Sequence, residues 1–196
     1  MEDDYDGEFR YDREPVGALQ GLAPERVVYI GSISKSLSPA LRLGWMVLPE
    51  HLLAPVLAAK GEREAWASVA DQLTLADFID SAHYDRHIRR MRQRYRARRD
   101  RLVATLSARA PHIAPTGIAA GLHMVLHLPP GTERSVVEAA AWQSIALNGL
   151  ADFRHPAAVM PAHDGLVIGY ATPPEHAYGP ALEALCRILP SVPAES

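Results

Sequence analysis

Residues 27–49 constrain the fold most strongly, because two strand-like segments flank a short polar loop there. Val27–Ile30 is continuously apolar, with β-branched and aromatic side chains, which predicts a buried strand. Residues 31–40 are rich in small polar residues and predict a loop, and Leu41–Leu48 predicts a second strand that stops before Pro49. Two buried strands followed by long helical patterns predict an α/β fold.

Helical and strand patterns alternate through the rest of the chain. Their periodicity predicts helices over residues 49–60, 65–81, 83–108, 133–147 and 174–189, and strands over residues 112–114, 122–128 and 166–171. Asn148 and Gly149 are expected to cap the helix over residues 133–147. We therefore expect the end of a large α/β sheet domain followed by a small α+β domain. The expected parts are residues 1–82 for the large domain, 83–110 for a connecting helix, 111–190 for the small domain and 191–196 for a tail.

Composition narrows the class of protein. The 196 residues carry 48% hydrophobic residues, which is ample for a core, and a net charge of −3, which argues against nucleic acid as the overall partner. Cys186 is the one cysteine, which excludes an internal disulfide framework and fits a reducing compartment. The sequence holds no run of about 18 apolar residues that would span a membrane. We expect a cytoplasmic location and no membrane partner.

Lys35 is the candidate chemical residue of the predicted loop. It is one of only two lysines, against eighteen arginines, and small hydroxyl residues surround it. A lysine amine can form a Schiff base with pyridoxal phosphate (PLP), and Arg42, seven residues later, offers a bidentate fork for the phosphate. Ser32 and Ser34 offer further hydrogen-bond donors. The residues alone also fit a solvated lysine in a surface loop beside an arginine in a strand.

Two competing motifs lie in the same part of the chain. Residues 32–35 match the S-x-x-K pattern of penicillin-binding proteins, with Ser32 as nucleophile, but the S-D-N and K-T-G tripeptides of that family do not occur. Residues 2–7 match the first half of a calcium loop, but Arg13 stands where the loop needs its bidentate Glu. We reject both motifs and expect no metal site.

Asp3 and Tyr5 are candidate partners for a cofactor ring. They alternate with one residue between them, so on an extended segment their side chains point to the same side. An ionised aspartate keeps the pyridine nitrogen of PLP protonated, and a tyrosine hydroxyl can bind the phenolate oxygen of the ring. The residues alone leave open which of the N-terminal acids would act.

Several segments together closely resemble the effector domain of MocR-type regulators of the GntR superfamily, which fuse a winged helix-turn-helix domain to a fold-type I aminotransferase domain. The resemblance extends from residue 2 to about residue 189. The segments that carry it are residues 2–11, 18–22, 28–45, 83–92 and 120–123.

The resemblance implies a role for each candidate residue. Lys35 matches the Schiff-base lysine, and Ser32 and Arg42 match phosphate-binding positions. Asp3 matches the partner of the pyridine nitrogen, and Tyr5 matches the partner of the ring oxygen. The implied cofactor is pyridoxal 5'-phosphate.

One position departs from the family pattern. Related aminotransferases carry an Arg two residues before the Gly-aromatic pair of the last strand, where it binds the substrate carboxylate. Val167 occupies that place here, which leaves catalytic turnover open and weakens amino-acid recognition of the usual kind. Arg154 is a possible substitute that no pattern in the sequence supports.

The resemblance also implies what lies outside this sequence. We expect the winged-helix domain, through which alone DNA would be bound, and the first half of the cofactor domain to lie upstream. The intact protein is expected to be a homodimer whose effector is an amino compound or PLP itself. On its own this chain is expected to expose apolar sheet edges and faces, to be poorly stable or to aggregate, and to bind PLP weakly or not at all. The alternatives are part of a true class I/II aminotransferase, and an inert truncated product without a complete cofactor site.

Three further patterns favour structural roles. Nine arginines lie between Arg86 and Arg101, and the apolar stripe among them predicts an amphipathic helix with a solvated basic face. The pairs His83/His87 and His123/His127 each share a face, but neither has a third metal ligand in view, so a structural role is expected for both. Cys186 is expected in the core.

Overall fold

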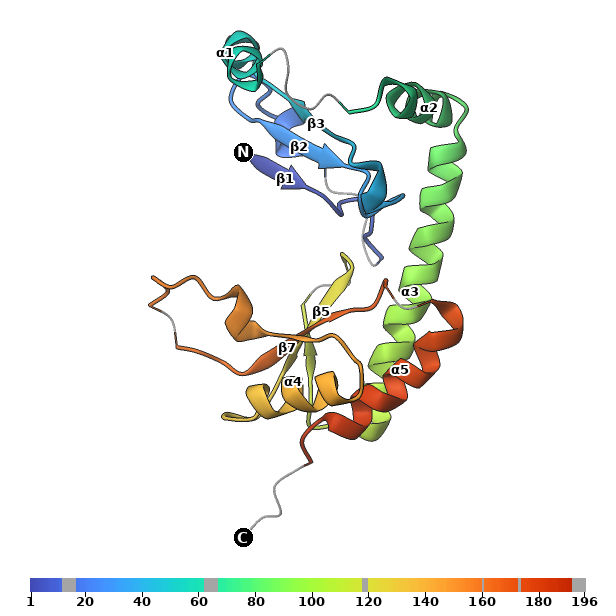
Figure 1. Ribbon diagram of the computed structural model, residues 1–196, viewed down its shortest axis with the longest axis vertical. Coiled ribbons are helices and arrows are strands. Elements are labelled where there is room, and N and C mark those ends of the chain that lie inside the picture. The colour runs from blue at the N-terminus through green and yellow to red at the C-terminus, as the bar shows by residue number, and fades with distance from the viewer. Residues whose placement is uncertain (12–16, 62–66, 118–119, 160, 173, 192–196) are drawn as a thin grey trace. The chain divides into compact units, whose positions relative to one another are not determined.

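The computed structural model describes residues 1–11, 17–61, 67–117, 120–159, 161–172 and 174–191. The chain divides into two compact units, residues 1–93 (unit 1) and residues 94–196 (unit 2). The boundary falls inside the long helix α3 (His83–Arg109), shown in light green in Figure 1.

Unit 1 contains a three-stranded sheet in the order β1-β2-β3. β1 (Glu2–Asp4) pairs in parallel with β2 (Tyr29–Ser32), and β3 (Gly44–Val47) pairs antiparallel with β2 on its other side (Figure 1). Both predicted strands exist, but β2 begins two residues later than predicted. The N–H groups of Arg26 and Val27 bond back to the Ala23 carbonyl, and this turn delays the strand.

The second predicted strand is shorter than expected for a similar local reason. Residues Pro39–Leu41 form a 3₁₀ helix whose first turn is capped by the Ser38 hydroxyl, which accepts from Ala40 N at 3.2 Å. Arg42 then adopts left-handed backbone angles, with φ 53° and ψ 30°, so extended structure starts only at Gly44. A second 3₁₀ turn, Leu19–Gly21, is capped by the Glu2 carboxylate, which accepts from Leu19 N and Gln20 N at 3.0 Å each.

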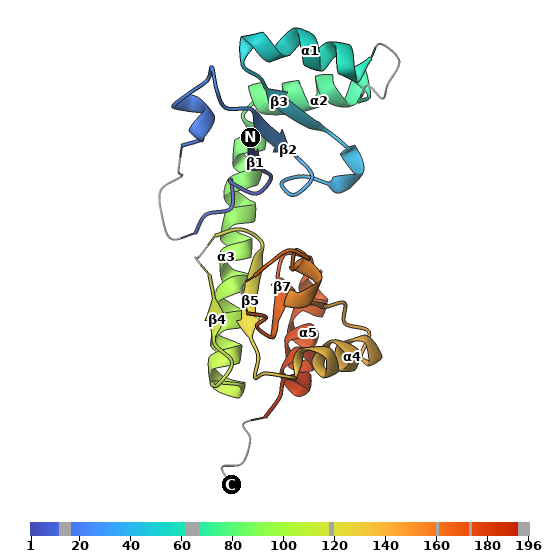
Figure 2. The same ribbon diagram turned by 90° about the vertical axis from the view of Figure 1, so that its left-hand side faces the viewer.

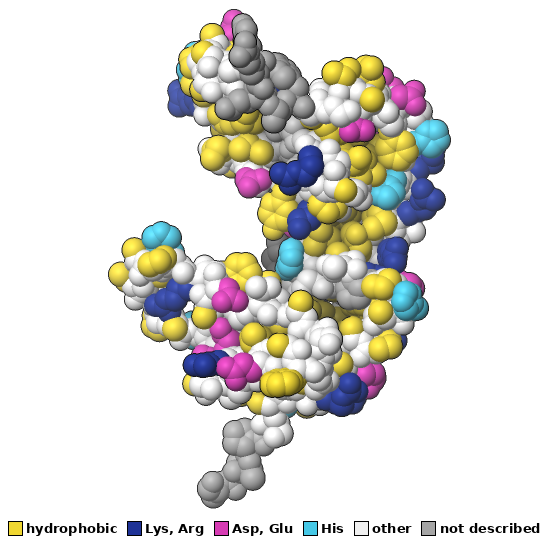
Figure 3. Space-filling view, viewed as in Figure 1, with side chains coloured by type: hydrophobic (Ala, Val, Ile, Leu, Met, Phe, Trp, Pro, Cys, Tyr) yellow, Lys and Arg dark blue, Asp and Glu magenta, His cyan; other side chains and the backbone are white. Residues whose placement is uncertain are grey.

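The helices α1 (Glu50–Lys60) and α2 (Val69–Asp80) agree with the predicted helices to within a few residues. Gly61 ends α1 at φ 73°, as its sequence position predicted. Neither helix buries a residue among those described, and all four residues of β3 are exposed. Hydrophobic side chains accordingly gather on the visible surface of unit 1 (Figure 3), which confirms the expected exposure of apolar faces. The large exposed ones on β3, α1 and α2 are Trp45, Met46, Val47, Leu53, Leu57, Val69, Leu73 and Ile79.

Unit 2 contains a four-stranded sheet in the order β4-β5-β7-β6, with antiparallel pairing throughout. Its strands are β4 (Pro115–Thr116), β5 (His123–His127), β6 (Asn148–Gly149) and β7 (Gly165–Gly169), and its further helices are α4 (Glu133–Trp142) and α5 (Glu175–Ile188) (Figure 2). β5 alternates between exposed histidines and buried Met124 and Leu126, and the buried face joins the core. None of the helices in the described part of the chain has the length and apolar character needed to cross a membrane.

The predicted end of the helix over residues 133–147 is wrong. α4 stops at Trp142 because Ser144 takes a left-handed conformation at φ 58°, with its N–H bonded to Ala141 O and the next N–H bonded to Ala140 O. These two bonds form a Schellman cap, which glycine usually provides. Asn148 and Gly149, expected to cap the helix, form β6 instead.

The predicted apolar stripe of α3 is confirmed for Ile88, Tyr95, Leu102 and Leu106, which are buried, whereas its other two members, Tyr84 and Met91, are half-buried. The prediction that its arginines form a solvated face is wrong for Arg98, which is only 3% exposed.

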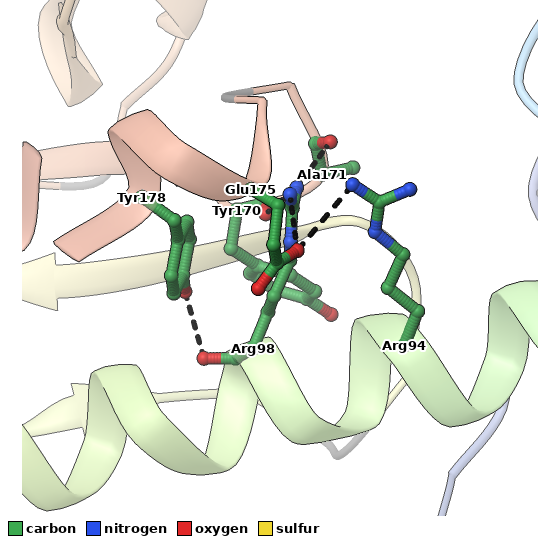
Figure 4. Close-up of polar contacts among 6 residues, drawn as sticks. All are labelled: Arg94, Arg98, Tyr170, Ala171, Glu175 and Tyr178. Carbon is green, nitrogen blue, oxygen red and sulfur yellow. Dashed lines mark hydrogen bonds and ion pairs between the residues drawn. The ribbon is translucent and has the colours of Figure 1, made fainter.

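Arg98 connects α3 to the segment between β7 and α5 (Figure 4). Its Nη1 donates to Ala171 O at 2.8 Å and to Tyr170 O at 3.5 Å, and its Nη2 pairs with Glu175 at 3.1 Å. The Tyr178 hydroxyl donates to Arg98 O at 2.7 Å, and the guanidinium lies 4.9 Å from the Tyr178 ring centroid. The guanidinium thereby satisfies two carbonyl groups that precede α5.

We predict that Arg98→Ala destabilises unit 2 by about 2–4 kcal/mol, because it leaves buried carbonyls without a donor and opens a cavity. Arg94 supplies a matched control: it also pairs with Glu175, at 3.4 Å, but its side chain is 45% exposed. Arg94→Ala should cost less than about 1 kcal/mol, as exposed ion pairs do. Urea denaturation of both variants measures the difference, and equal losses would contradict the assignment.

Candidate functional site

The sheet of unit 1 presents Asp3 and Ser32 on the same face. Asp3 lies opposite Ile30 in the parallel pairing of β1 and β2, and Ser32 follows Ile30 by two residues, so their side chains project to the same side. Gly44 lies opposite Ser32 on β3. A Cβ at Gly44 would meet only the Gly31 carbonyl at 3.1 Å and Ser32 Cβ at 3.9 Å, so glycine leaves this face open beside Ser32.

On the opposite face of the sheet, Trp45 covers Gly31. Its indole lies across Gly31, where an added Cβ would stand 2.5 Å from the ring. On the same face, the Tyr29 hydroxyl donates to Asp4 Oδ2 at 3.2 Å. Side chains along β1 alternate between the two faces of the sheet, so Asp3 is exposed on one face and Asp4 accepts a hydrogen bond on the other.

Lys35 lies in a tight turn within a loop of residues 33–43. Ile33 N donates to Leu43 O at 3.3 Å, which closes the loop, and Leu37 N donates to Ile33 O at 2.8 Å inside it. Ile33 and Leu43 are buried, with 1% and 6% exposure, whereas Lys35 is exposed. The loop therefore has a fixed apolar base and presents the lysine to the outside.

Arg42 lies on the same loop, one residue before its closing bond. Its left-handed φ of 53° is uncommon for a residue with a side chain, and its side chain is exposed. Ser32, at the start of the loop, already hydrogen bonds locally: its Oγ accepts from Ser34 N at 3.0 Å and donates to Ser34 Oγ at 2.9 Å. Ser32 also ends a strand and does not open a helix, which agrees with rejecting the S-x-x-K motif.

The five predicted site residues all lie in unit 1, on β1, β2 and the loop that follows β2. Tyr5 follows β1 and is 41% exposed, and burial together with the charges of Asp6 and Asp3 raises the pKa of its hydroxyl. In the described part of the chain, no hydrogen bond or ion pair joins any of the five directly to another. They are Asp3, Tyr5, Ser32, Lys35 and Arg42.

A polar cluster that the sequence did not reveal lies beside Lys35. Ser36 is only 2% exposed, and its Oγ lies 3.0 Å from the Tyr84 hydroxyl of α3. That hydroxyl lies 3.0 Å from Glu8 Oε1, and His87 Nε2 lies 2.7 Å from Ser36 O. Tyr84 lies in the predicted apolar stripe of α3, and the contacts join residues 48 to 76 positions apart, so no local pattern could have shown them.

His83 and His87 have structural contacts, as expected for that pair. His87 donates to the Ser36 carbonyl, and His83 Nδ1 lies 2.6 Å from Ser81 Oγ. Among the described residues there is no group of three or more side chains able to hold a metal ion. Cys186 is half-buried, and that burial raises the pKa of its thiol.

In unit 2, Val167 lies on β7 directly opposite Val125 of β5 and is half-buried. Arg154 is exposed in the irregular segment that precedes β7, where its guanidinium donates to Ala158 O at 3.3 Å. The substitution of Arg154 for a missing carboxylate-binding arginine stays a prediction.

Comparison with known proteins identifies the family. The family model described as aminotransferase class I and II matches residues 6–158. The chain belongs to the aminotransferase class I and II family.

Within this family the chain is similar to helix-turn-helix regulators. It is 40% identical over 150 residues to the HTH-type transcriptional regulator YhdI of Bacillus subtilis, covering 75% of this chain and 32% of that protein. It is 34% identical over 176 residues to the probable rhizopine catabolism regulatory protein MocR of Rhizobium meliloti, covering 87% of this chain and 35% of that protein. The predicted resemblance to MocR-type regulators is confirmed, and the chain spans about a third of the length of these relatives.

Solved aminotransferases share the fold. The kynurenine aminotransferase of Pyrococcus horikoshii has a TM-score of 0.81 and 25% identity, covering 95% of this chain and 46% of that one. The α-aminoadipate aminotransferase LysN of Thermus thermophilus has a TM-score of 0.82 and 23% identity, covering 95% of this chain and 49% of that one. The predicted fold-type I class, an α/β fold, is confirmed.

The left-handed backbone at Arg42 allows a test of its role in this aminotransferase-family loop. Arg42→Gly removes the steric cost of a side chain at positive φ, and we expect it to leave stability unchanged or raise it by up to about 1 kcal/mol. If Arg42 binds phosphate, the same variant should weaken PLP binding. A urea titration and a PLP titration measured together check this, and a loss of stability would contradict it.

The pKa values of two tyrosines in unit 1 predict a pH dependence. Burial first, and then Asp4, raises the pKa of Tyr29 to about 12, and burial is likewise the largest cause that raises the pKa of Tyr84 to about 12. Unfolded tyrosine ionises near pH 10. Stability is therefore complete below pH 10 and falls as the pH rises from 10 to 12, because only the unfolded chain loses these protons. Denaturation at several pH values should show this slope, and Tyr29→Phe should flatten it.

Proposed function

We propose that this chain is the C-terminal part of a PLP-binding, aminotransferase-like effector domain of a MocR-type transcriptional regulator, with Lys35 as the residue that holds the cofactor. One observation carries the proposal: Lys35 is exposed on a loop whose base is buried. Ser32 directly precedes this loop, and Arg42 lies near its end. An accessible amine on a fixed backbone, beside groups suited to an anion, fits an aldehyde cofactor that carries a phosphate.

The chemistry of each side chain suits the role proposed for it. Lys35 would hold PLP through Nζ, and the Arg42 guanidinium and the Ser32 hydroxyl would bind the phosphate oxygens. The exposed Asp3 carboxylate would keep a proton on the pyridine nitrogen, and the Tyr5 hydroxyl, protonated at neutral pH, would donate to the ring oxygen. When bound, PLP acts as an electron sink for amino compounds.

The remaining parts of the proposal concern the longer protein. Because the matched part is about a third of each similar regulator and YhdI is named for a helix-turn-helix, we propose that such a domain reads DNA in the whole protein. An amino compound or PLP would be the effector, and the whole protein would be a cytoplasmic homodimer. Val167, in place of an arginine for the substrate carboxylate, supports sensing over turnover.

The two-lysine composition makes a direct test possible. The 196-residue chain is incubated with substoichiometric PLP, reduced with borohydride and digested, and the labelled peptides are quantified by mass spectrometry. We expect the peptide that contains Lys35 to carry more label than the one that contains Lys60, which lies exposed at the end of α1. A preorganised phosphate site at Lys35 accounts for the preference, since both lysines have the same intrinsic amine chemistry.

Lys35→Ala and Lys60→Ala are the matched controls. Lys35→Ala should abolish the preferred label, and Lys60→Ala should leave it unchanged. Equal labelling of the two lysines in the wild type would refute the proposal and favour an inert chain. Inorganic phosphate should compete at Lys35 only, because only that site is proposed to bind phosphate.

A further inference from the structure

The Tyr84 hydroxyl links the lysine loop to the N-terminal segment. It lies 3.0 Å from Ser36 Oγ and 3.0 Å from Glu8 Oε1. A hydroxyl has one proton to donate, and the Glu8 carboxylate can only accept. The proton of Tyr84 therefore points to Glu8, and Ser36 donates its own proton to Tyr84. The result is a directed chain from Ser36 through Tyr84 to Glu8.

The residues at both ends of this hydrogen-bond chain, Ser36 and Glu8, also bind α3 through their main-chain carbonyls. His87 Nε2 lies 2.7 Å from Ser36 O, where it can only be the donor. Arg92 Nε donates to Glu8 O. Both ends of the hydrogen-bond chain are thus also tied by their backbone to α3, and the three α3 residues involved lie within residues 84–92.

We propose that Ser36, Tyr84 and Glu8 form a positioning clamp for Lys35, and that His87 completes it by holding the Ser36 carbonyl. The proposal rests on the proposed function of Lys35. Ser36 directly follows Lys35, and consecutive Cα atoms are about 3.8 Å apart, so fixing one limits where the other can lie. The clamp holds the backbone on the buried side of the turn and leaves the lysine amine accessible on the other.

If these contacts only stabilised unit 1, hydrogen-bonding side chains would not be needed at these positions. Buried hydrogen-bonded groups are often no more stabilising than apolar groups of the same shape, but they fix one geometry because each donor must meet its acceptor. In the described structure, the turn makes only one main-chain hydrogen bond within itself, from Leu37 N to Ile33 O at 2.8 Å. The position of Lys35 therefore depends on contacts that α3 supplies.

The test compares Tyr84→Phe with Tyr178→Phe in the full 196-residue chain. Each variant removes one hydrogen-bonded hydroxyl, from the half-buried Tyr84 or from the buried Tyr178, but Tyr178 donates to Arg98 O in unit 2. Hydrogen exchange measured by mass spectrometry reports opening of residues 33–43, and the borohydride assay reports the ratio of label on Lys35 to label on Lys60. Tyr84→Phe should speed exchange in this loop by roughly 3- to 10-fold, the effect of one lost hydrogen bond, and lower the labelling ratio, whereas Tyr178→Phe should change neither.

Two further variants separate positioning from folding. Glu8→Gln keeps an oxygen that accepts from Tyr84 and should retain most of the labelling ratio, whereas Glu8→Ala should lower it as Tyr84→Phe does. Ser36→Ala should also speed exchange in the loop while β1 and β2 stay protected. Loss of protection throughout unit 1 in both Tyr84→Phe and Ser36→Ala would overturn the proposal, because it would assign these contacts to folding of the unit.

The outcomes also separate the clamp from the proposed function. If wild-type Lys35 shows no preferred labelling but Tyr84→Phe still opens the loop selectively, the cofactor proposal fails and the positioning of the turn stands. If labelling of Lys35 is preferred but unaffected by Tyr84→Phe, the clamp fails and the cofactor proposal stands.

Discussion

A lysine can serve chemistry only if its backbone is fixed while its amine remains accessible, and the loop over residues 33–43 meets both conditions by alternating buried and exposed residues. Ile33 and Ser36 are buried, and Lys35 between them is exposed. Ile33 is held by apolar contacts and by its bond to Leu43 O, whereas Ser36 is held by hydrogen bonds to α3. Three elements of unit 1 maintain this arrangement of buried and exposed residues: β2 leads into the loop, β3 leads out of it, and α3 supports its buried side.

The helix α3 supplies this support with polar residues in both of the units it enters. In unit 1 its Tyr84 and His87 hold the lysine loop, and in unit 2 its Arg98 holds the carbonyls before α5. The sequence had suggested a helix with one apolar stripe and one solvated basic face. Arg98 shows why that description is incomplete: a guanidinium can be buried when its donors meet carbonyl groups at close range, and a periodicity argument counts it as polar and places it outside.

How much the sequence could predict depends on whether the deciding contact is local. The ends of α1 were predicted well because Pro49 and Gly61 act within their own turn. The end of α4 was missed because Ser144, a residue with no preference for positive φ, provides the cap in place of a glycine. In the proposed site, Lys35 was singled out because lysine is rare in this sequence, and Arg42 because it follows Lys35 by seven residues. The partners of Ser36 were missed because Tyr84 and His87 lie 48 and 51 positions away in the chain and meet Ser36 only in the fold.

The small core of unit 1 explains why hydrogen bonds position the lysine. Its sheet has three strands of three or four residues, and α1 and α2 bury no described residue. With little apolar surface removed from water, packing alone defines the position of a surface loop poorly, since burial is non-directional. Directed hydrogen bonds do not need a large core to fix a geometry, so the lysine loop keeps a defined attachment to α3 even where β3 and α2 expose their apolar side chains. Among the residues of this unit that the structure describes, the buried hydrophobic core consists of Phe9, Tyr11, Ile33, Leu43 and Ile88.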